Sequence, residues 1–530
     1  MQESGTFHKG LGYWTLTGIS LGGIIGSGWL LGSMYAAQVA GPESIVAWII
    51  GGIAILLVAL VFVELAIARP ESGGLVRWPR YTNGVMVSSI IGWAMWLSYA
   101  ANPPTEASGI LQYASHYIQG IYTGTALTPL GIILAILLML LFVAINYFGV
   151  RIFARANLVI TILKFVVPTL TLIMLFLTGF HSGNFTQYGG FAPYGWSPGL
   201  SAIATSGVIF AYTGFRASID LSGEAVNPKR DITRAVITAV IVAIVLYICL
   251  ELVFVGAVPG NVLAKAGWQG VNFSSPFAQI AMALNLTWLL WLIYADALIS
   301  PAGSSFVYTA SNSRIVYGLA KNRFFPTFFA NLHTRFGVPT RALLLNFVVG
   351  LLFLIPLKSW HSIISVTGSL GVFTYAAGAV SVIVFRRMNI TKQDQRLRGM
   401  TIIAPLAFIV ASLIIYWAGW STLSTTIPLL IVGIIVYFIS FLTTRSDARG
   451  ILSGLWIIVY VAGLLVLSYL GSFDGLKVIP APWDSVVAAV FALLIYIWAV
   501  SAGVAYMKQS SDVLSEVELN AEGQAMVTGD

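Results

Sequence analysis

Long uninterrupted apolar runs constrain this 530-residue chain more than any other feature of its sequence. A helix that crosses a membrane needs about 20 mostly apolar residues, and runs of that length recur along the whole chain. A transmembrane β-barrel would instead alternate apolar and polar residues over strands of about ten residues. Only 9% of the residues are charged, against about 25% in soluble domains, which excludes a soluble or disordered chain. The sequence therefore predicts an all-α polytopic membrane protein.

About fourteen candidate membrane spans follow from a window of about 20 residues. We expect residues 1–11 to form a cytoplasmic N-terminus without a cleavable signal peptide, and residues 510–530 to form an acidic cytoplasmic tail. The predicted spans are residues 12–38, 43–68, 84–113, 127–148, 152–179, 199–221, 234–257, 278–312, 339–357, 360–385, 400–419, 424–443, 451–471 and 485–507.

The basic residues fall almost entirely on one side of this predicted topology. If the N-terminus is cytoplasmic, only Lys265, Lys358 and Lys477 lie in outer loops, while Lys164 and Arg216 fall within spans. The positive-inside rule therefore indicates an even number of spans in the plasma membrane, with both termini in the cytoplasm. The net charge of +8 is thus a topology signal and not the basic stripe of a nucleic-acid binder. The five histidines are scattered, and their spacing predicts no metal site.

Two spans are interrupted by glycine-rich segments. The first contains GIIGSGWLLG at residues 23–32, and the sixth contains FAYTGFRAS at residues 210–218, preceded by Gly207. Glycine costs about 1 kcal/mol in a helix interior relative to alanine, and close helix packing is its plainest explanation. Interrupted helices at matching places in two halves of a chain, however, point to a transporter with inverted repeats.

Unwound helix segments would turn the backbone into a binding site. Freed N–H and C=O groups need partners where no water is present, and the N-terminus of a half-helix favours an anion. A zwitterionic amino acid fits this arrangement, with its carboxylate on the backbone of residues 26–28 and its amino group on the carbonyls of both breaks. Aromatic side chains of the sixth span would form a lid over it. The predicted substrate-binding residues are Ile24, Ile25, Gly26, Ser27, Gly28, Phe210, Ala211, Tyr212, Thr213, Gly214 and Phe215.

The Gly-Ser-Gly break of the first span resembles the signature of the amino acid–polyamine–organocation transporter superfamily. Four further segments resemble that family in the same order along the chain, over roughly the first 390 residues. They are VELAIARPESGGLVRW at 63–78, NYFGVRIFARAN at 146–157, SGEAVNPKRDI at 222–232 and SNSRIVYGLAKNRFFP at 311–326.

The resemblance implies the five-plus-five inverted-repeat fold shared with sodium-coupled leucine transporters. The first five-helix repeat would cover residues 12–198, the second residues 199–388, and four additional helices residues 389–509. The implied activity is secondary transport of amino acids or related amines by alternating access, with no cofactor. The implied partners are the small-molecule substrate and the lipid bilayer.

Lys164 is the most conspicuous ionisable residue within a span, where burial of charge is expensive. In the resembled family, a lysine of the fifth span commonly takes the place of a sodium ion, and Ser304 and Ser305 fall near its hydroxyl ligands. Transport would then be independent of sodium. Lys164 would either release its proton during the cycle, which gives proton coupling, or act as a fixed cation in an exchanger or facilitator. A purely structural ion pair is the third reading.

Arg216 departs from the family pattern just after the break of the sixth span. It would pair with Asp220 one helical turn on, pair with Glu106 of the third span, or contact the substrate directly. The prolines 103 and 104 make that third span locally irregular beside the expected pocket. The predicted pocket residues and charge partners are Asn102, Thr105, Glu106, Arg216 and Asp220.

Other functional classes have less support in the sequence. A membrane-embedded enzyme would need a catalytic signature such as HExxH or a GxSxG nucleophile elbow. No HExxH is present, and the two GxSxG strings, at residues 18–22 and 195–199, do not follow a predicted strand as a nucleophile elbow would. A channel or a transport-inactive sensor on the same fold is a further alternative, although the sequence carries no additional soluble domain for sensing.

Overall fold

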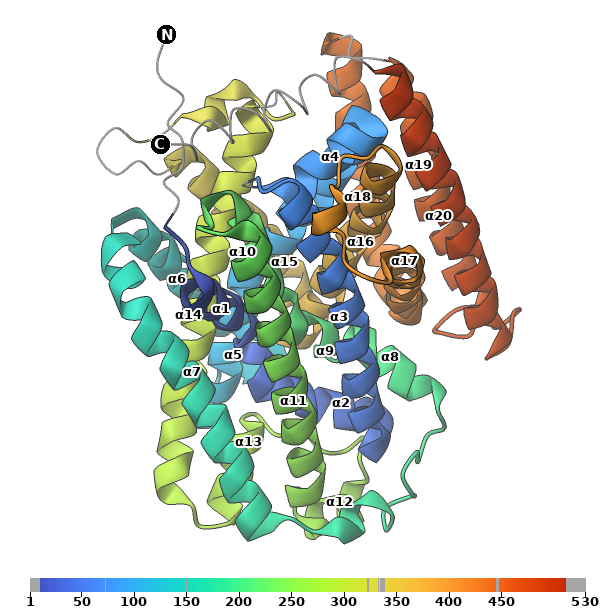
Figure 1. Cartoon of the computed structure of the whole chain (residues 1–530). Helices are drawn as coiled ribbons and strands as arrows, with labels where there is room; N and C mark the ends of the chain where they lie inside the picture. Colours follow the sequence, from blue (N-terminus) through green and yellow to red (C-terminus); the bar gives the residue numbers. More distant parts are fainter. Residues whose placement is uncertain are drawn as a thin grey trace.

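The computed structural model describes residues 10–71, 73–148, 150–321, 324–331, 333, 339–444 and 448–510, and these are mostly helical. The two short strands, β1 (Tyr122–Thr123) and β2 (Ala126–Leu127), form an antiparallel hairpin with Tyr122 opposite Leu127 and Thr123 opposite Ala126. The described chain begins and ends toward the same end of the helix bundle (Figure 1). The predicted cytoplasmic ends, 1–11 and 510–530, lie almost wholly outside the described residues.

The first half of the chain already contains both interrupted spans. Its helical elements are α1 (Tyr13–Ile24), α2 (Ser27–Ala40), η1 (Gly41–Glu43), α3 (Ser44–Ala68), α4 (Gly74–Ala100), α5 (Asn102–Ala114), α6 (Pro129–Phe148), α7 (Val150–Gly179), η2 (Ser182–Phe185), α8 (Ser197–Thr205), α9 (Val208–Tyr212), η3 (Thr213–Phe215), α10 (Arg216–Asp220), η4 (Ser222–Glu224) and η5 (Pro228–Ile232).

The second half of the chain consists mainly of long helices joined by short loops. Its helical elements are α11 (Thr233–Ala257), α12 (Gly260–Ala266), α13 (Pro276–Ala283), α14 (Thr287–Lys321), η6 (Thr327–Ala330), α15 (Thr340–Leu357), α16 (Trp360–Arg387), η7 (Gln393–Gln395), α17 (Met400–Trp417), α18 (Gly419–Thr444), α19 (Ala448–Leu470) and α20 (Trp483–Gln509).

The all-α polytopic architecture predicted from the sequence is confirmed, and every predicted span coincides with helix. In the described residues, 12 helical stretches are long and apolar enough to cross a membrane. One of them, Ser27–Ala68, runs from the first predicted span through the second, and the sixth span is divided into helices too short to qualify. The number fourteen and the inverted repeat therefore stay predictions.

Two predicted spans differ from the structure in their limits. The third begins at Gly74 and not at 84, because the chain is already helical there and only kinks at Gly84, where φ is 82°. The eighth is split into α13 and α14, since Asn285 adopts a φ of 57° between them, and α14 continues to Lys321. Both differences arise where a single residue with positive φ turns the chain.

The two interrupted spans lie against each other near the middle of the bundle (Figure 1). Helix α1 packs against η3 and α10, and α2 packs against α8 and α9. The first break, at residues 25–26, falls inside the predicted segment. The sixth span is interrupted twice. One interruption lies at Ser206 and Gly207, where Gly207 has a φ of 91°, a backbone conformation that favours glycine, and the other is the 3-10 element η3 within the predicted segment 210–218.

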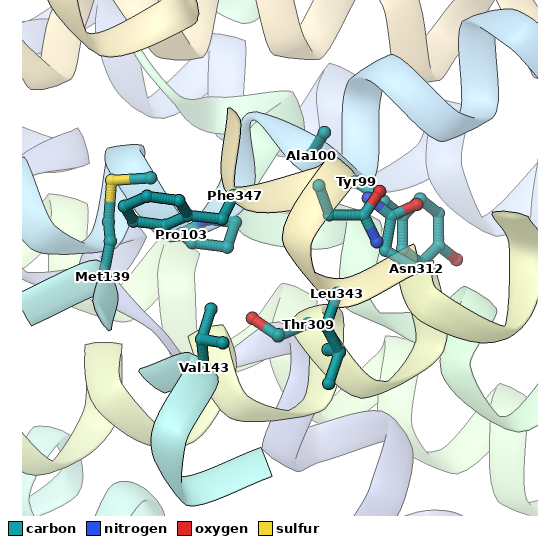
Figure 2. Close-up of a pocket in the computed structure, with 10 residues that line it drawn as sticks. Tyr99, Ala100, Pro103, Met139, Val143, Thr309, Asn312, Leu343 and Phe347 are labelled. Atoms are coloured by element: carbon teal, nitrogen blue, oxygen red, sulfur yellow. The ribbon is translucent and has the colours of Figure 1, made fainter. Parts of the chain in front are cut away.

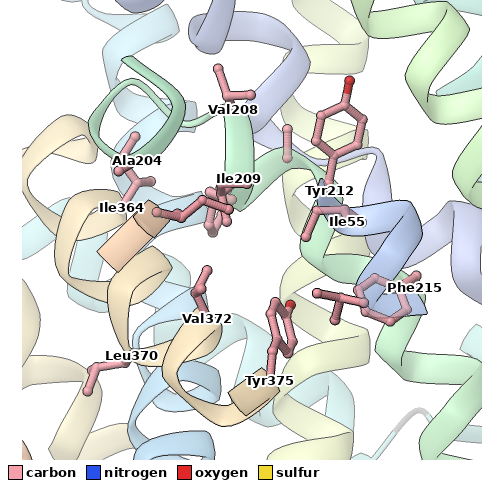
Figure 3. Close-up of a cluster of buried hydrophobic side chains, with 14 of the residues drawn as sticks. Ile55, Ala204, Val208, Ile209, Tyr212, Phe215, Ile364, Leu370, Val372 and Tyr375 are labelled. Atoms are coloured by element: carbon pink, nitrogen blue, oxygen red, sulfur yellow. The ribbon is translucent and has the colours of Figure 1, made fainter. Parts of the chain in front are cut away.

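A cluster of apolar side chains fixes the short helix α9 in place. Figure 3 shows Ile209 of α9 facing Ile364 of α16, which is buried throughout its most apolar stretch, while the ring of Tyr212 packs on Trp48 of α3 and Tyr247 of α11. Helices α4 and α17 cover α16 in turn. Because apolar side chains gain little from association in lipid, such packing relies on close van der Waals fit. The rigid neighbour α16 therefore positions the broken sixth span.

Candidate functional site

The break between α1 and α2 exposes backbone groups in the interior of the molecule. Helix α1 ends at Ile24 and α2 begins at Ser27, so that Ile25 and Gly26 have non-helical backbone angles. The first N–H groups of a helix and the last C=O groups have no partner within the helix. Both kinds of group therefore face each other across two residues, as the sequence predicted.

The N-terminus of α2 is occupied by a carboxylate of the protein itself. Glu106 of α5 is 1% exposed, and its Oε2 accepts a hydrogen bond of 2.9 Å from the backbone N–H of Ser27. Its Oε1 accepts a longer bond of 3.5 Å from Asn102. A Cβ atom on Gly26 would lie 2.6 Å from the same Oε1, so only glycine leaves room for this carboxylate. Glu106 therefore does not pair with Arg216, as one reading of the sequence proposed.

The carbonyl end of α1 is held by a cation and by a hydroxyl. The ammonium Nζ of Lys164 donates a 2.7 Å hydrogen bond to the carbonyl of Gly22, and Lys164 is 1% exposed. The hydroxyl of Tyr247 donates to the carbonyl of Ile24 at 3.0 Å. Lys164 thus contacts a carbonyl of the first span, as expected for a residue in the place of a sodium ion.

Helix α14 completes the surroundings of Lys164. Its backbone approaches the lysine closely at Gly303, where a Cβ would lie 3.2 Å from Nζ. Ser304 lies beside Gly26 and interacts with Glu106, while the hydroxyl of Ser305 is buried and has no partner within the described residues. The two hydroxyls that were expected next to Lys164 therefore have different surroundings: the Ser304 hydroxyl interacts with Glu106, and the Ser305 hydroxyl does not.

The sixth span contributes less backbone than the sequence predicted. The carbonyl of Phe210 accepts a 2.8 Å bond from the Thr213 hydroxyl within its own turn. Gly214 lies directly against Gly23, whose added Cβ would be 3.0 Å from the Gly214 carbonyl. Gly28 is close to Ala211 in the same way, since a Cβ added at Gly28 would lie 2.8 Å from the Cβ of Ala211. These small residues let the two broken spans contact each other, as expected if the glycines serve close helix packing.

A small central cavity lies next to these contacts. It is narrow: the space between its lining atoms is about 220 Å³, including any part that opens to solvent. Its walls combine α4, α5, the broken sixth span, α14 and α16. The lining residues are Ser98, Asn102, Phe210, Thr213, Arg216, Tyr308, Thr367 and Gly368.

Only some of the predicted substrate residues reach this cavity. Phe210 and Thr213 line it, whereas Tyr212 packs on aromatic rings of α3 and α11, and Phe215 packs on Tyr375 of α16. Thr105 uses its hydroxyl within α5, where it donates to the carbonyl of Ala101 at 2.7 Å. Asn102 lines the cavity, and its Oδ1 is buried without a hydrogen-bond partner in the described residues.

Arg216 is a buried cation on the wall of the central cavity. It is 2% exposed, its guanidinium lies 4.8 Å from the ring of Tyr99 and 5.6 Å from that of Tyr375, and its Nε donates to the carbonyl of Thr213 at 3.3 Å. Within the described residues, Nη1 has no hydrogen-bond partner. Asp220, the predicted partner, instead accepts a 2.8 Å bond from the Tyr99 hydroxyl. The arginine thus keeps donor capacity free beside the cavity.

A second cavity lies between α4, α5, α6, α14 and α15 (Figure 2). The space between its lining atoms is about 290 Å³, including any part that opens to solvent, and Tyr99 contributes to its wall as well as stacking on Arg216. Asn312 and Thr309 line it, and the side-chain polar atoms of both lack partners in the described part of the chain. Buried polar atoms of this kind are usually satisfied by water.

Several residues at the site could not be identified from the sequence pattern. Trp360 donates its indole N–H to the Ser27 hydroxyl at 2.7 Å, and Trp29 donates to Asp296 at 3.0 Å. Tyr247 is equally inconspicuous in an apolar span. Aromatic residues are frequent in such spans, so only the charge of Asp296 within a span could have drawn attention to this group.

The family model and the similar proteins all point to amino acid transporters. The family model described as amino acid permease matches residues 11–441. The chain is 38% identical over 535 residues to the glutamate/serine transporter AimA of Bacillus subtilis, covering 98% of each chain. It is 35% identical over 513 residues to the aspartate-proton symporter of the same organism, covering 95% of this chain and 98% of the relative. The branched-chain amino acid permease BcaP of that organism is 24% identical over 443 residues, with 81% and 92% covered.

Proposed function

The chain belongs to the amino acid permease family and is a membrane transporter of amino acids, and from that premise we propose that it carries acidic and small neutral amino acids into the cell together with protons. The relatives named for glutamate and serine and for aspartate and protons match nearly the whole chain. The resemblance seen in the sequence is thereby confirmed at the level of the family.

The observation that carries the substrate proposal is the free donor of Arg216. A buried cation is costly unless it is paired or meets an anion. Asp220 interacts with Arg216 electrostatically but accepts its hydrogen bond from Tyr99, and the direct contacts of the guanidinium are with two aromatic rings and one carbonyl. The side-chain carboxylate of aspartate or glutamate would accept a charge-assisted hydrogen bond from Nη1. The cavity beside Asn102 would widen in the substrate-bound state to hold the rest of the molecule.

Lys164 supports transport without sodium. Its ammonium already donates to the Gly22 carbonyl and fills the space against Gly303, where a second cation would meet like charge. The proton is then the coupling ion that the named symporter relative suggests. The alternative is an exchanger or facilitator with Lys164 as a fixed cation, and the names of the three relatives described above do not indicate it.

We further propose a location in the plasma membrane with both termini in the cytoplasm. The asymmetry of loop Lys and Arg residues supports that orientation. The two five-helix repeats, 12–198 and 199–388, and the four following helices keep their limits in this proposal.

Uptake into proteoliposomes tests the function directly. We expect labelled L-aspartate to accumulate in sodium-free buffer only under an inward proton gradient, and a protonophore to abolish that accumulation. Excess glutamate and serine should compete, whereas arginine and leucine should not. Preference for arginine would contradict the role of Arg216, and gradient-independent exchange would favour the exchanger.

A further inference from the structure

The carboxylate of Glu106 occupies the position at the N-terminus of α2 where the carboxylate of a bound amino acid would be held. We call this position the seat of Glu106. The N-terminus of α2 is the half-helix end at the break, and an anion is favoured there by free N–H groups and by the helix dipole. In the structure, the carboxylate on the Ser27 N–H belongs to the protein, at 2.9 Å. A substrate carboxylate that uses the same N–H must therefore replace Glu106.

The route to this seat starts at the central cavity. Asn102 lines that cavity and also donates to Glu106 at 3.5 Å, while its own Oδ1 is buried without a partner in the described residues. Tyr99, Asn102 and Glu106 follow each other at helical spacing across the α4–α5 junction, so they share one face. Seven residues along a helix span about 10 Å. This face of α4 and α5 therefore connects Arg216, on which Tyr99 stacks, with the N-terminus of α2, where Glu106 is bound.

The charged and titratable groups that face Glu106 come from several elements. Lys164 of α7 interacts with it electrostatically, and the same lysine interacts with Asp296 of α14. Tyr247 of α11 and Ser304 of α14 are the other neighbours. Lys164 thus stands between two carboxylates, and the three groups together carry one negative charge when all are ionised.

We propose that Glu106 is the residue that couples the proton to the substrate, because its carboxylate and that of the substrate compete for the N-terminus of α2. This inference rests on the proposed function. When the substrate takes the Ser27 N–H, Glu106 leaves the donors that stabilise its charge. A buried carboxylate without donors is costly, so it binds a proton from the outer side. After the substrate leaves toward the cytoplasm, Glu106 returns to Ser27 and releases that proton there.

Lys164 is less suited to this exchange than Glu106. Its Nζ is engaged by the Gly22 carbonyl and packed against Gly303, and it is not among the residues that line the central cavity. Glu106, by contrast, contacts the lining residue Asn102. Substrate entry changes the surroundings of the carboxylate first.

The pH dependence of aspartate binding to the purified protein tests the inference. In the wild type, the dissociation constant should rise with pH, approaching tenfold per pH unit for one linked proton. In Glu106→Gln, which has the same shape and can still accept from Ser27, it should be constant with pH. The matched control is Glu251→Gln, because Glu251 is an equally buried carboxylate held by Ser44 and Trp48 away from this seat. In that variant, the dissociation constant of aspartate should rise with pH as steeply as in the wild type.

Proton uptake gives a second readout that does not depend on transport. Addition of aspartate to the wild type in weakly buffered solution should remove about one proton per bound molecule, and addition to Glu106→Gln should remove none. If the wild type shows the slope and Glu106→Gln retains it, the proton is bound elsewhere and the inference fails alone. If the wild type shows neither a slope nor aspartate binding, the proposed function fails instead.

Discussion

Replacement of Arg216 by glutamine should weaken the binding of acidic substrates and leave the binding of neutral substrates almost unchanged. The guanidinium is 2% exposed on the cavity wall and keeps Nη1 without a partner in the described residues. A hydrogen bond to a charged group contributes about 1.5–3 kcal/mol. Since 1.4 kcal/mol is tenfold in affinity, aspartate should bind about 10- to 150-fold more weakly to Arg216→Gln. Serine has no side-chain carboxylate, so its affinity should change little.

The assay is competition against labelled serine in proteoliposomes, with both affinities measured on the same preparation. Arg216→Lys should lie between wild type and Arg216→Gln, because lysine keeps the charge without the planar fork. Arg341→Gln is the matched control, since Arg341 is an exposed arginine that stacks on Phe328 at 3.9 Å, far from the cavity lining. Equal losses of aspartate and serine binding in Arg216→Gln would refute the assignment, as would no loss at all.

Gly28→Leu should abolish transport in a protein that still inserts, because even a Cβ at this position would lie 2.8 Å from Cβ of Ala211; normal uptake would show that α2 and α9 need not touch. Wild-type uptake should be equal in sodium and potassium buffers, since Lys164 already holds the Gly22 carbonyl, and a sodium requirement would contradict this. An experimental map that shows ordered water should place one on Asn312 in the cavity of Figure 2, whereas protein partners for both amide atoms would exclude it.

Apolar run length was enough to predict the architecture because the membrane leaves few alternatives to helices. The first break was predictable as well, since glycines flank a single serine in an otherwise apolar span. The second break was predicted from Gly207 and Gly214 together, and the helix is interrupted at both places. Both glycines are required, but one supplies a positive φ and the other a close contact with Gly23, and composition does not distinguish these needs.

The pairing of the buried charges could not be predicted from spacing. Arg216 and Asp220 are one turn apart, which suggested an ion pair, yet Tyr99 takes the aspartate and two aromatic rings cover the arginine. Glu106 was one of the alternative partners proposed for Arg216, and it instead accepts a hydrogen bond from the N-terminus of α2. Such choices depend on which faces of distant helices meet, and the sequence of a single span carries no such information.

A structure with L-aspartate bound at acidic pH tests the account most directly. We predict an α-carboxylate oxygen within about 2.7–3.2 Å of the Ser27 N–H, which is hydrogen-bond distance, with the Glu106 side chain withdrawn and the substrate side chain on Arg216. Aspartate bound elsewhere, or bound while Glu106 still accepts from Ser27, would contradict the account.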